Sequence, residues 1–254
     1  MDVNQLLVYT ISKMTIGPLV RFKLRLKSEG AWNIPAEGPA LIVCNHRNPV
    51  LDPMSLALSV ERPVNFIAAS VAFNLPVISQ LFWAWGVSPV DVFGGEKSRA
   101  GLQTAVNMLK DGELVGVFPE GVHTIAKLHA VAKVRTFRTG FARIAFEAKV
   151  PVIPTCVIGS GERNLPRIPP ALVKPFFDHP DFQQGVQWNY YKRAYVRIGR
   201  PLDLSEYYKQ EMTKELISEI SGKVRRIVMK LYNGEDLDRF LTGEKPFDIY
   251  YDRV

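Results

Sequence analysis

The run Ala40-Leu41-Ile42-Val43-Cys44 (ALIVC), followed directly by Asn45-His46, decides the fold of this chain. All five residues of the run are apolar, so both faces of the segment avoid water, as in a strand of a parallel sheet that helices cover on both sides. Two later runs share this pattern, Leu114 to Phe118 (LVGVF) and Pro151 to Ile158 (PVIPTCVI). Together the three runs predict a largely parallel central sheet.

The segments between these runs have the apolar spacing of helices that flank a sheet. They are Pro53 to Val60, Glu96 to Lys110 and Thr139 to Lys149. Strands and helices therefore alternate as in βαβ units, which predicts the α/β class. The stretch from Pro63 to Val90 contains no charged residue. Because polar residues and prolines interrupt it, we expect a strand, a short helix and a second strand buried in protein rather than a membrane span.

The N-terminal segment places apolar side chains at helical spacing from Val3 to Met14, before Gly17-Pro18 breaks the pattern. We expect an amphipathic helix within residues 1–18 that associates with a membrane. From Val20 to Lys27 (VRFKLRLK), apolar and cationic residues alternate strictly, which predicts a half-buried strand. The cations of that strand face either anionic lipid or solvent.

The C-terminal part carries a long amphipathic stripe from Met212 to Leu231, and Asn233-Gly234 is expected to end this helix. No repeat or low-complexity linker divides the chain. We therefore expect one globular domain over residues 19–233 and a partly ordered tail over residues 234–254.

The composition limits the classes of protein to consider. The chain has 254 residues, 47% of them hydrophobic, which is enough for one substantial core. A net charge of +7 favours anionic partners such as acidic lipids, phosphorylated substrates or nucleic acid. Nucleic acid ranks last, and no nucleic-acid partner is expected, because aromatic and basic residues are not interleaved and no recognition motif is present.

The two cysteines, Cys44 and Cys156, lie in apolar runs. This suits buried thiols in a reducing compartment better than a disulfide framework or a metal cluster. The first 16 residues lack the cationic start, apolar centre and cleavage site of a secretory signal. We therefore expect a protein that faces the cytosol.

Polar residues gather at the carboxyl ends of the expected strands, where open α/β sheets bind ligands. Asn45-His46 follows ALIVC, Gly86 to Asp91 follows an aromatic stretch, and Pro119-Glu120-Gly121 follows LVGVF. Because the carboxyl ends of parallel strands meet at one edge of a sheet, these segments are expected to converge on a single site.

Four motifs occur in order over roughly residues 35 to 160: Asn45-His46 with a downstream Asp52, a central segment at Gly86, Phe118-Pro119-Glu120-Gly121, and the stretch from Val150 to Pro154. Their order and spacing resemble those of the lysophospholipid (1-acylglycerol-3-phosphate) acyltransferase family. The resemblance implies transfer of a fatty acyl group from an acyl-CoA or acyl-carrier-protein thioester to a glycerolipid hydroxyl. It implies no cofactor, no metal and no covalent acyl-enzyme.

His46 suits the role of general base, because an alcohol is a poor nucleophile and an imidazole with an ordinary pKa of about 6.5 can take its proton. A carboxylate on the other ring nitrogen, here Asp52, would fix the tautomer and stabilise the imidazolium. Asp52-Pro53 also suits the start of a helix, so a capping role stays open. The family usually places four residues between the histidine and the aspartate. Five stand here, and Asn48-Pro49 can form a turn that absorbs the extra one.

The Phe-Pro-Glu-Gly motif contacts the acceptor in the family. The resemblance therefore makes Phe118, Pro119, Glu120 and Gly121 the expected acceptor-binding residues, with Glu120 at the glycerol portion.

Two phosphate-binding arginines that the family commonly carries are replaced here by Val92 and His123. The stretch from Gly121 to Arg143 contains five cations and no acid. Arg138 lies in a Phe-Arg-Thr-Gly element that resembles the family's Phe-Lys-x-Gly, and it is the first choice for a substrate phosphate. Arg47, beside His46, is the reserve candidate, with a solvent-facing turn as its alternative. The other four cations, Lys127, Lys133, Arg135 and Arg143, are expected to be solvated.

The expected reaction converts 1-acylglycerol 3-phosphate to phosphatidate. Because the usual arginines are absent, another lysophospholipid, a glycolipid or a neutral acylglycerol stays open as the acceptor. A non-catalytic lipid-binding module on the same fold is the alternative outside enzymes. The expected partners are membrane lipid and the acyl thioester donor, and the expected location is the cytoplasmic face of a membrane, as a peripheral or monotopic protein. Leu75 to Gly86 (LPVISQLFWAWG) is either core packing or a functional segment, namely an interfacial anchor or a wall for the acyl chain.

Overall fold

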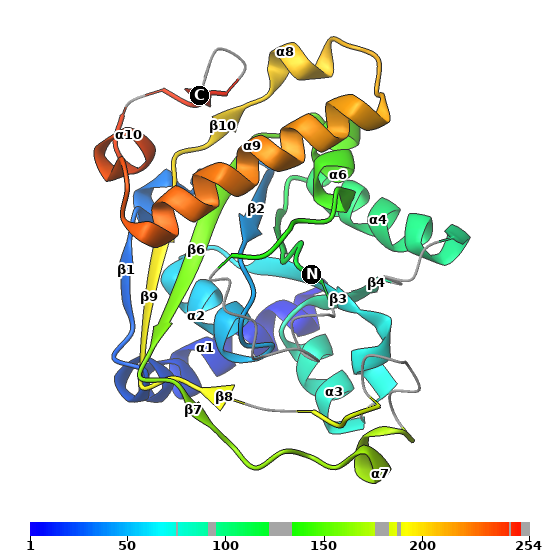
Figure 1. Cartoon of the computed structure of the whole chain (residues 1–254), viewed down its shortest axis with the longest axis vertical. Helices are drawn as coiled ribbons and strands as arrows, with labels where there is room; N and C mark the ends of the chain where they lie inside the picture. The colour runs from blue at the N-terminus through cyan, green and yellow to red at the C-terminus, as the bar shows by residue number, and fades with distance from the viewer. Residues whose placement is uncertain are drawn as a thin grey trace.

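The computed structural model of the protein describes residues 1–74, 76–90, 95–121, 134–175, 183–186, 189–243 and 245–249. One sheet runs through the middle of the molecule, and helices lie on both of its faces (Figure 1). Its strands are β1 (Lys27–Glu29), β2 (Ala40–Cys44), β3 (Val64–Ala69), β4 (Val87–Val90), β5 (Leu114–Val117), β6 (Val152–Ser160), β9 (Arg193–Ile198), β10 (Leu202–Asp203) and β11 (Phe247–Asp248). A separate antiparallel pair consists of β7 (Arg163–Asn164) and β8 (Asn189–Tyr190).

The helices that surround the sheet differ widely in length. They are α1 (Val3–Lys23), α2 (Leu51–Ser59), α3 (Pro76–Ala84), α4 (Gly95–Lys110), α6 (Gly140–Ala148), α7 (Pro170–Val173), α8 (Ser205–Tyr208), α9 (Lys214–Asn233) and α10 (Leu237–Leu241), with short 3-10 turns η1 (Ala31–Asn33) and η2 (Ser70–Asn74).

The order of the strands places β2 near the centre of the sheet. It runs β1-β9-β6-β2-β5-β3-β4, and β10 lies beside β6 at one end. From β6 to β4 every neighbouring pair is parallel, whereas β9 and β10 are antiparallel to β6. The predicted α/β class, with a largely parallel sheet flanked by helices and an N-terminal helix, is confirmed.

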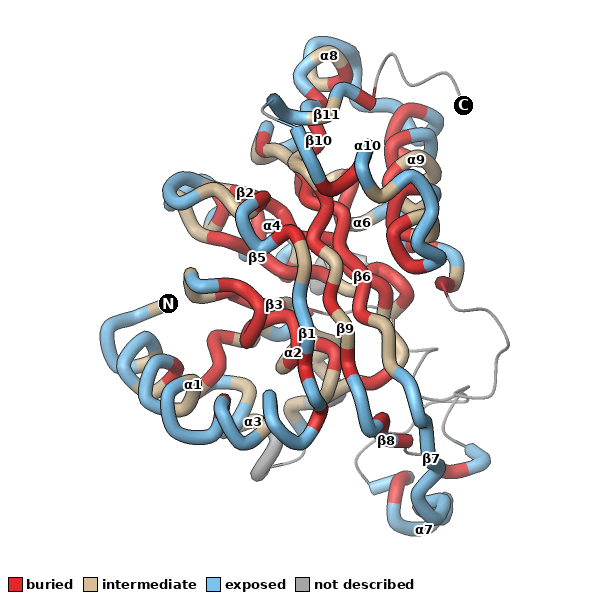
Figure 2. Tube along the Cα trace, turned by 90° about the vertical axis from the view of Figure 1, so that its left-hand side faces the viewer, coloured by how far each residue is buried: buried red, intermediate tan, exposed pale blue. Residues whose placement is uncertain are grey.

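Strand β2 divides the core between the two faces of the sheet. Leu41 and Val43 pack on one face with residues of α4, α6 and α9. The alternate residues Ala40, Ile42 and Cys44 pack on the other face with α1 and α2. Figure 2 shows the buried residues concentrated along these central strands. The predicted covering of both faces therefore follows from the apolar pattern of β2, and this burial fixes the end of the strand where Asn45-His46 begins.

The expected end of the N-terminal helix at Gly17-Pro18 is wrong, because α1 continues to Lys23. Gly17 does not break the helix; it allows close packing, since a Cβ there would lie 2.8 Å from Leu58 Cδ2. Pro18 is exposed, so water can satisfy the carbonyl that its missing N–H leaves unpaired.

The predicted strand from Val20 to Lys27 is also wrong. Its first four residues form the last turn of α1, and β1 begins only at Lys27. Leu24 and Leu26 are buried as the alternation predicts, but Phe22 is exposed to solvent. Two-residue alternation over such a short distance did not distinguish a strand from a helix end followed by a turn.

The remaining predicted elements are present close to their expected bounds. The stretch after Pro63 forms β3, η2, α3 and β4, and helix α9 ends at Gly234, whose φ of +80° suits glycine. Both cysteines are buried and free. In the described part of residues 234–254, α10 and β11 form, and Phe240, Leu241 and Ile249 are buried.

Candidate active site

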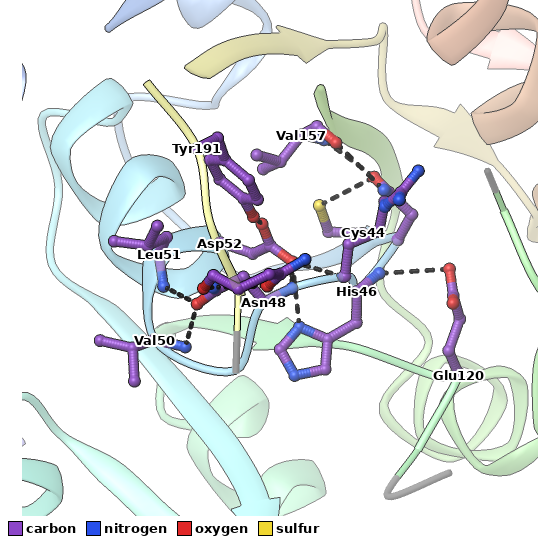
Figure 3. Close-up of polar contacts among 12 residues, drawn as sticks. Cys44, His46, Asn48, Val50, Leu51, Asp52, Glu120, Val157 and Tyr191 are labelled. Carbon is purple, nitrogen blue, oxygen red and sulfur yellow. Dashed lines mark hydrogen bonds and ion pairs between the residues drawn. The ribbon is translucent and has the colours of Figure 1, made fainter. Parts of the chain in front are cut away.

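The loop between β2 and α2 begins with Asn45, which is fully buried. Its side-chain oxygen accepts a hydrogen bond from the backbone N–H of Val157 at 2.8 Å, and its amide donates to the Val157 carbonyl at 3.1 Å. Val157 belongs to the neighbouring strand β6, so Asn45 ties the end of β2 to that strand. The next residue, His46, therefore leaves the sheet in a fixed direction at the carboxyl edge (Figure 3).

His46 and Asp52 lie together. Nδ1 of His46 is 3.3 Å from Oδ2 of Asp52, and Asp52 is almost fully buried. This distance is that of an ion pair, but the angles are not those of a hydrogen bond. Among the described residues, Nδ1 of His46 has no hydrogen-bond partner. Oδ2 also accepts hydrogen bonds from the backbone N–H groups of Arg47 at 2.6 Å and Asn48 at 2.7 Å. Asp52 thus faces the ring, and the other ring nitrogen points away from it (Figure 3).

The extra residue between His46 and Asp52 is absorbed at Asn48, as the turn-forming pair predicted. Asn48 Oδ1 accepts the backbone N–H groups of Val50 at 3.0 Å and Leu51 at 2.7 Å. Asn48 therefore satisfies backbone donors at Val50, the N-cap position of α2, and at Leu51, its first residue. The alternative role of Asp52 as the N-cap is wrong, because Asp52 lies inside the first turn. Its negative charge is nevertheless favourable near the helix N-terminus.

The Phe-Pro-Glu-Gly motif follows β5 and reaches His46, since β2 and β5 are parallel neighbours. Glu120 is 5% exposed, and its Oε1 accepts the backbone N–H of His46 at 3.2 Å. Burial raises the pKa of Glu120 above its ordinary value, although His46 and Arg135 favour the charged form. The Phe118 ring lies 4.5 Å from the His46 ring, centroid to centroid. The site therefore has an apolar wall beside the imidazole and a buried carboxylate behind it.

Arg138 lies against the same motif. Its backbone N–H donates to the Pro119 carbonyl at 2.8 Å. Gly121 has a φ of +73°, and a Cβ at that position would be 3.0 Å from Nε of Arg138. The guanidinium therefore lies next to Gly121 of the predicted acceptor site.

Arg47, the reserve candidate, is paired. Its Nη2 lies 2.9 Å and 3.1 Å from the two carboxylate oxygens of Glu162. Although burial opposes the charge, Glu162 and Tyr232 raise the pKa of Arg47 above its ordinary value. A substrate phosphate at Arg47 would have to compete with Glu162.

Three residues of the site were not assigned a role from the sequence. Arg135, expected to be solvated, is close enough for its charge to act on Glu120, and burial lowers its pKa against that attraction. Tyr191 donates its hydroxyl proton to Asp52 Oδ1, and Asn189 accepts from Asn48. The stretch without acids around Arg135 could have indicated that this residue is near the site. No sequence motif marks Tyr191 or Asn189. Val92, His123, Lys127 and Lys133 lie outside the described residues.

The family model described as Acyltransferase matches residues 25–158, which include His46, Asp52 and the Phe-Pro-Glu-Gly motif. The chain belongs to the acyltransferase family. An uncharacterized protein of Mycobacterium tuberculosis is 32% identical over 160 residues, which cover 58% of this chain and 42% of that protein. The chain thus spans less than half the length of this relative.

Two other similarities cover more of both chains. The 1-acyl-sn-glycerol-3-phosphate acyltransferase of Salmonella typhimurium is 25% identical over 231 residues, 90% of this chain and 82% of that protein. The crystal structure of the 1-acyl-sn-glycerophosphate acyltransferase of Thermotoga maritima superposes with a TM-score of 0.54 over 87% of this chain and 81% of that chain. At 21% identity, the second similarity concerns the fold alone. The resemblance to the lysophospholipid acyltransferase family is confirmed.

Proposed function

We propose that this chain transfers a fatty acyl group from an acyl-CoA or acyl-carrier-protein thioester to the free hydroxyl of 1-acylglycerol 3-phosphate, giving phosphatidate. The observation that carries the proposal is the 3.3 Å approach of His46 Nδ1 to buried Asp52 Oδ2 at the carboxyl edge of the sheet. This arrangement holds a histidine as a general base beside an orienting carboxylate.

The reaction needs one proton acceptor and no covalent intermediate. The second nitrogen of His46, Nε2, takes the proton of the acceptor hydroxyl as its oxygen attacks the thioester carbonyl. The new C–O bond forms, the C–S bond breaks, and the thiolate leaves. Since a thiol has an ordinary pKa of about 8.5, the thiolate is a good leaving group and recovers the proton from the imidazolium. The proposal involves no metal and no cofactor.

The acceptor is positioned by the residues that follow β5. The carboxylate of Glu120 accepts a hydrogen bond from a hydroxyl of the glycerol portion. Arg138, packed over Gly121, binds the phosphate. Arg135 adds positive charge close to Glu120.

The acceptor is a lipid, and we propose that α1 attaches the protein to one leaflet of a membrane. Several exposed apolar side chains of α1 are spaced four, four, three and eight residues apart, which places them on one side of the helix. They are Val3, Leu7, Ile11, Met14 and Phe22. On α3, Leu81 and Trp83 are also exposed, whereas Trp85 just beyond it packs on Tyr9 in the core. Within the described residues, none of the helices is both long and apolar enough to span a bilayer.

The decisive experiment uses purified protein, radiolabelled acyl-CoA and two acceptors, 1-acylglycerol 3-phosphate and the neutral monoacylglycerol of the same chain length. We expect labelled phosphatidate from the first and much less product from the second. His46→Ala should lower the rate about a thousandfold without changing the circular dichroism spectrum. A folded His46→Ala variant with wild-type turnover would remove His46 from the mechanism, and equal rates on both acceptors would overturn the phosphate assignment. Binding of lysolipid without transfer by the wild type would support the lipid-binding module instead.

A further inference from the structure

The segment from Asn189 to Tyr191 reaches the loop of His46 from a distant part of the sequence. It consists of strand β8 and the first residue of its link to β9, and it lies beyond the end of the family match at residue 158. Asn189 and Tyr191 are buried, and Tyr190 between them is exposed. This two-residue alternation turns both buried side chains toward the same side of the strand.

Both side chains contact the loop directly. Asn48 Nδ2 donates to the backbone carbonyl of Asn189 at 2.7 Å and to its side-chain oxygen at 3.1 Å. The hydroxyl of Tyr191 donates to Asp52 Oδ1. The loop that carries His46 is therefore held at two points by one strand end, 139 positions from Asp52 along the chain.

The ring of Tyr191 is fixed as well as its hydroxyl. A Cβ at Gly159 would lie 2.4 Å from the ring, so glycine at this position of β6 makes room for it. Burial, and after it the charge of Asp52, raise the pKa of Tyr191 well above its ordinary value. The phenol therefore stays protonated near neutral pH and can donate to the carboxylate.

We propose that Tyr191 is a positioning residue of the acyl transfer, holding the Asp52 carboxylate in the orientation that faces His46. The proposal rests on the proposed function, in which His46 is the base. Two backbone N–H groups hold Oδ2 of Asp52, which also faces the ring, and the Tyr191 hydroxyl holds Oδ1, so these donors together fix the plane of the carboxylate. A neutral donor at Oδ1 fixes the group without supplying a cation that would compete with the imidazolium.

Loss of this donor has a defined effect on titration. Without the phenol, more negative charge stays on Asp52, and this favours a positive charge beside the carboxylate. The acid limb of the rate profile then moves to higher pH. The other charged and titratable groups that face this pair are Glu120 beyond β5, Arg135, the pair of Arg47 and Glu162, Tyr232 on α9, and Cys44 on β2. The Tyr191→Phe substitution leaves all of them in place.

The test compares Tyr191→Phe with Tyr195→Phe in the full chain, using the acyl-transfer assay across pH 5 to 9. Tyr195 lies on the adjoining strand β9, and its hydroxyl donates to Glu29 at 2.5 Å, away from the site. For Tyr191→Phe we expect kcat to fall about tenfold, both KM values to stay within about twofold, and the acid limb to shift upward. For Tyr195→Phe we expect the wild-type profile. The ring is retained in both variants, and melting temperatures report folding.

Wild-type kcat in Tyr191→Phe, or a lower kcat with an unshifted acid limb, would overturn the positioning role and leave Tyr191 a structural residue. Equal losses in both tyrosine variants would overturn it too. His46→Ala, measured in parallel, separates the two proposals. Activity in that variant defeats the proposed function itself, whereas an inactive His46→Ala beside a normal Tyr191→Phe defeats only the role of Tyr191.

Discussion

The loop from Asn45 to Asp52 and helix α1 both depart from the usual distribution of polar and apolar side chains, in opposite directions. In the loop, Asn45, Asn48 and Asp52 are buried, and their side chains have hydrogen-bond partners. On α1, the apolar side chains of Val3 and Phe22 are 83% and 86% exposed.

The two departures have different physical consequences. A buried polar group costs free energy unless it is hydrogen-bonded, so each partner in the loop fixes the geometry of the next. An exposed apolar stripe does not fix the geometry of its neighbours. Covering it with another apolar phase is favourable in free energy. Changes in the loop should therefore alter the rate of reaction, and changes on α1 should alter where the protein resides.

Asp52→Asn should produce the largest effect among the variants that keep His46. Replacing one carboxylate oxygen with an amide removes the charge beside the imidazolium and places a donor where two backbone N–H groups already point. We expect kcat to fall about a hundredfold or more, together with some loss of thermal stability. The control is Asp203→Asn, since Asp203 accepts the backbone N–H of Ser205 at an exposed turn. A stability loss with unchanged kcat would make Asp52 a purely structural partner of the loop.

Arg138→Ala should have the next largest effect, and it should lower activity mainly on the phosphorylated acceptor. A charge-assisted contact contributes about 1.5–3 kcal/mol, so kcat/KM for 1-acylglycerol 3-phosphate should fall about ten- to a hundredfold. Arg138→Lys should recover only part, because an ammonium cannot make the planar two-pronged contact. Arg143→Ala on α6 is the matched control and should retain activity. Equal losses on the neutral monoacylglycerol would show that Arg138 serves the fold or the thioester donor instead.

Phe22→Ser tests the proposed membrane contact of helix α1. Loss of one large apolar side chain should weaken binding to phospholipid vesicles about tenfold, because burial of such a side chain contributes about 1.5–3 kcal/mol. Leu172→Ser, which changes an exposed leucine on α7, should leave vesicle binding unchanged. Sedimentation with vesicles in high salt measures the apolar part, since screening does not weaken it. A Phe22→Ser protein that sediments like the wild type would remove this end of α1 from the membrane contact.

The sequence predicted the centre of the fold well because β2, β5 and β6 are apolar on both faces, a pattern that few other structures tolerate. It failed from Gly17 to Lys27. The pair Gly17-Pro18 is typical of a helix end. Here, however, Gly17 lets the helix pack closely against Leu58, a residue distant in the chain. Local pattern does not contain that information, so both the helix end and the following strand were misplaced.

The same distinction applies to the site. His46, Asp52 and Glu120 stand in short motifs, and adjacent parallel strands bring them together in a way that the topology makes predictable. Tyr191 was not predictable, because a single tyrosine near a strand has no signature and its contact spans 139 positions. Arg135 was misjudged for a related reason. Its proximity to Glu120 depends on the return of the chain to this edge, which the sequence does not specify.

Glu120→Gln should produce the smallest change in stability, and the size of that change depends on pH. The folded-state pKa of Glu120 is raised by burial above its ordinary value of 4.5. Between these two pKa values the folded protein binds more protons than the unfolded chain, so this residue makes stability fall as the pH rises. Glutamine has no such titration and can still accept the His46 N–H. The melting temperature of Glu120→Gln should therefore exceed that of the wild type at pH 8, with the difference closing as the pH falls toward 4.5.

The control for this last comparison is Glu147→Gln, at an exposed position of α6, which should leave the melting temperature close to that of the wild type. Acyl transfer by Glu120→Gln should fall over the same range in which the variant gains stability. A carboxylate that lowers stability where it is charged, and is needed for turnover there, behaves as part of a substrate site rather than of the scaffold. If Glu120→Gln were instead less stable than the wild type at pH 8, the attraction of Arg135 and His46 would outweigh the burial of Glu120. The buried acid would then belong with Asn45, as a group that holds the loop in place.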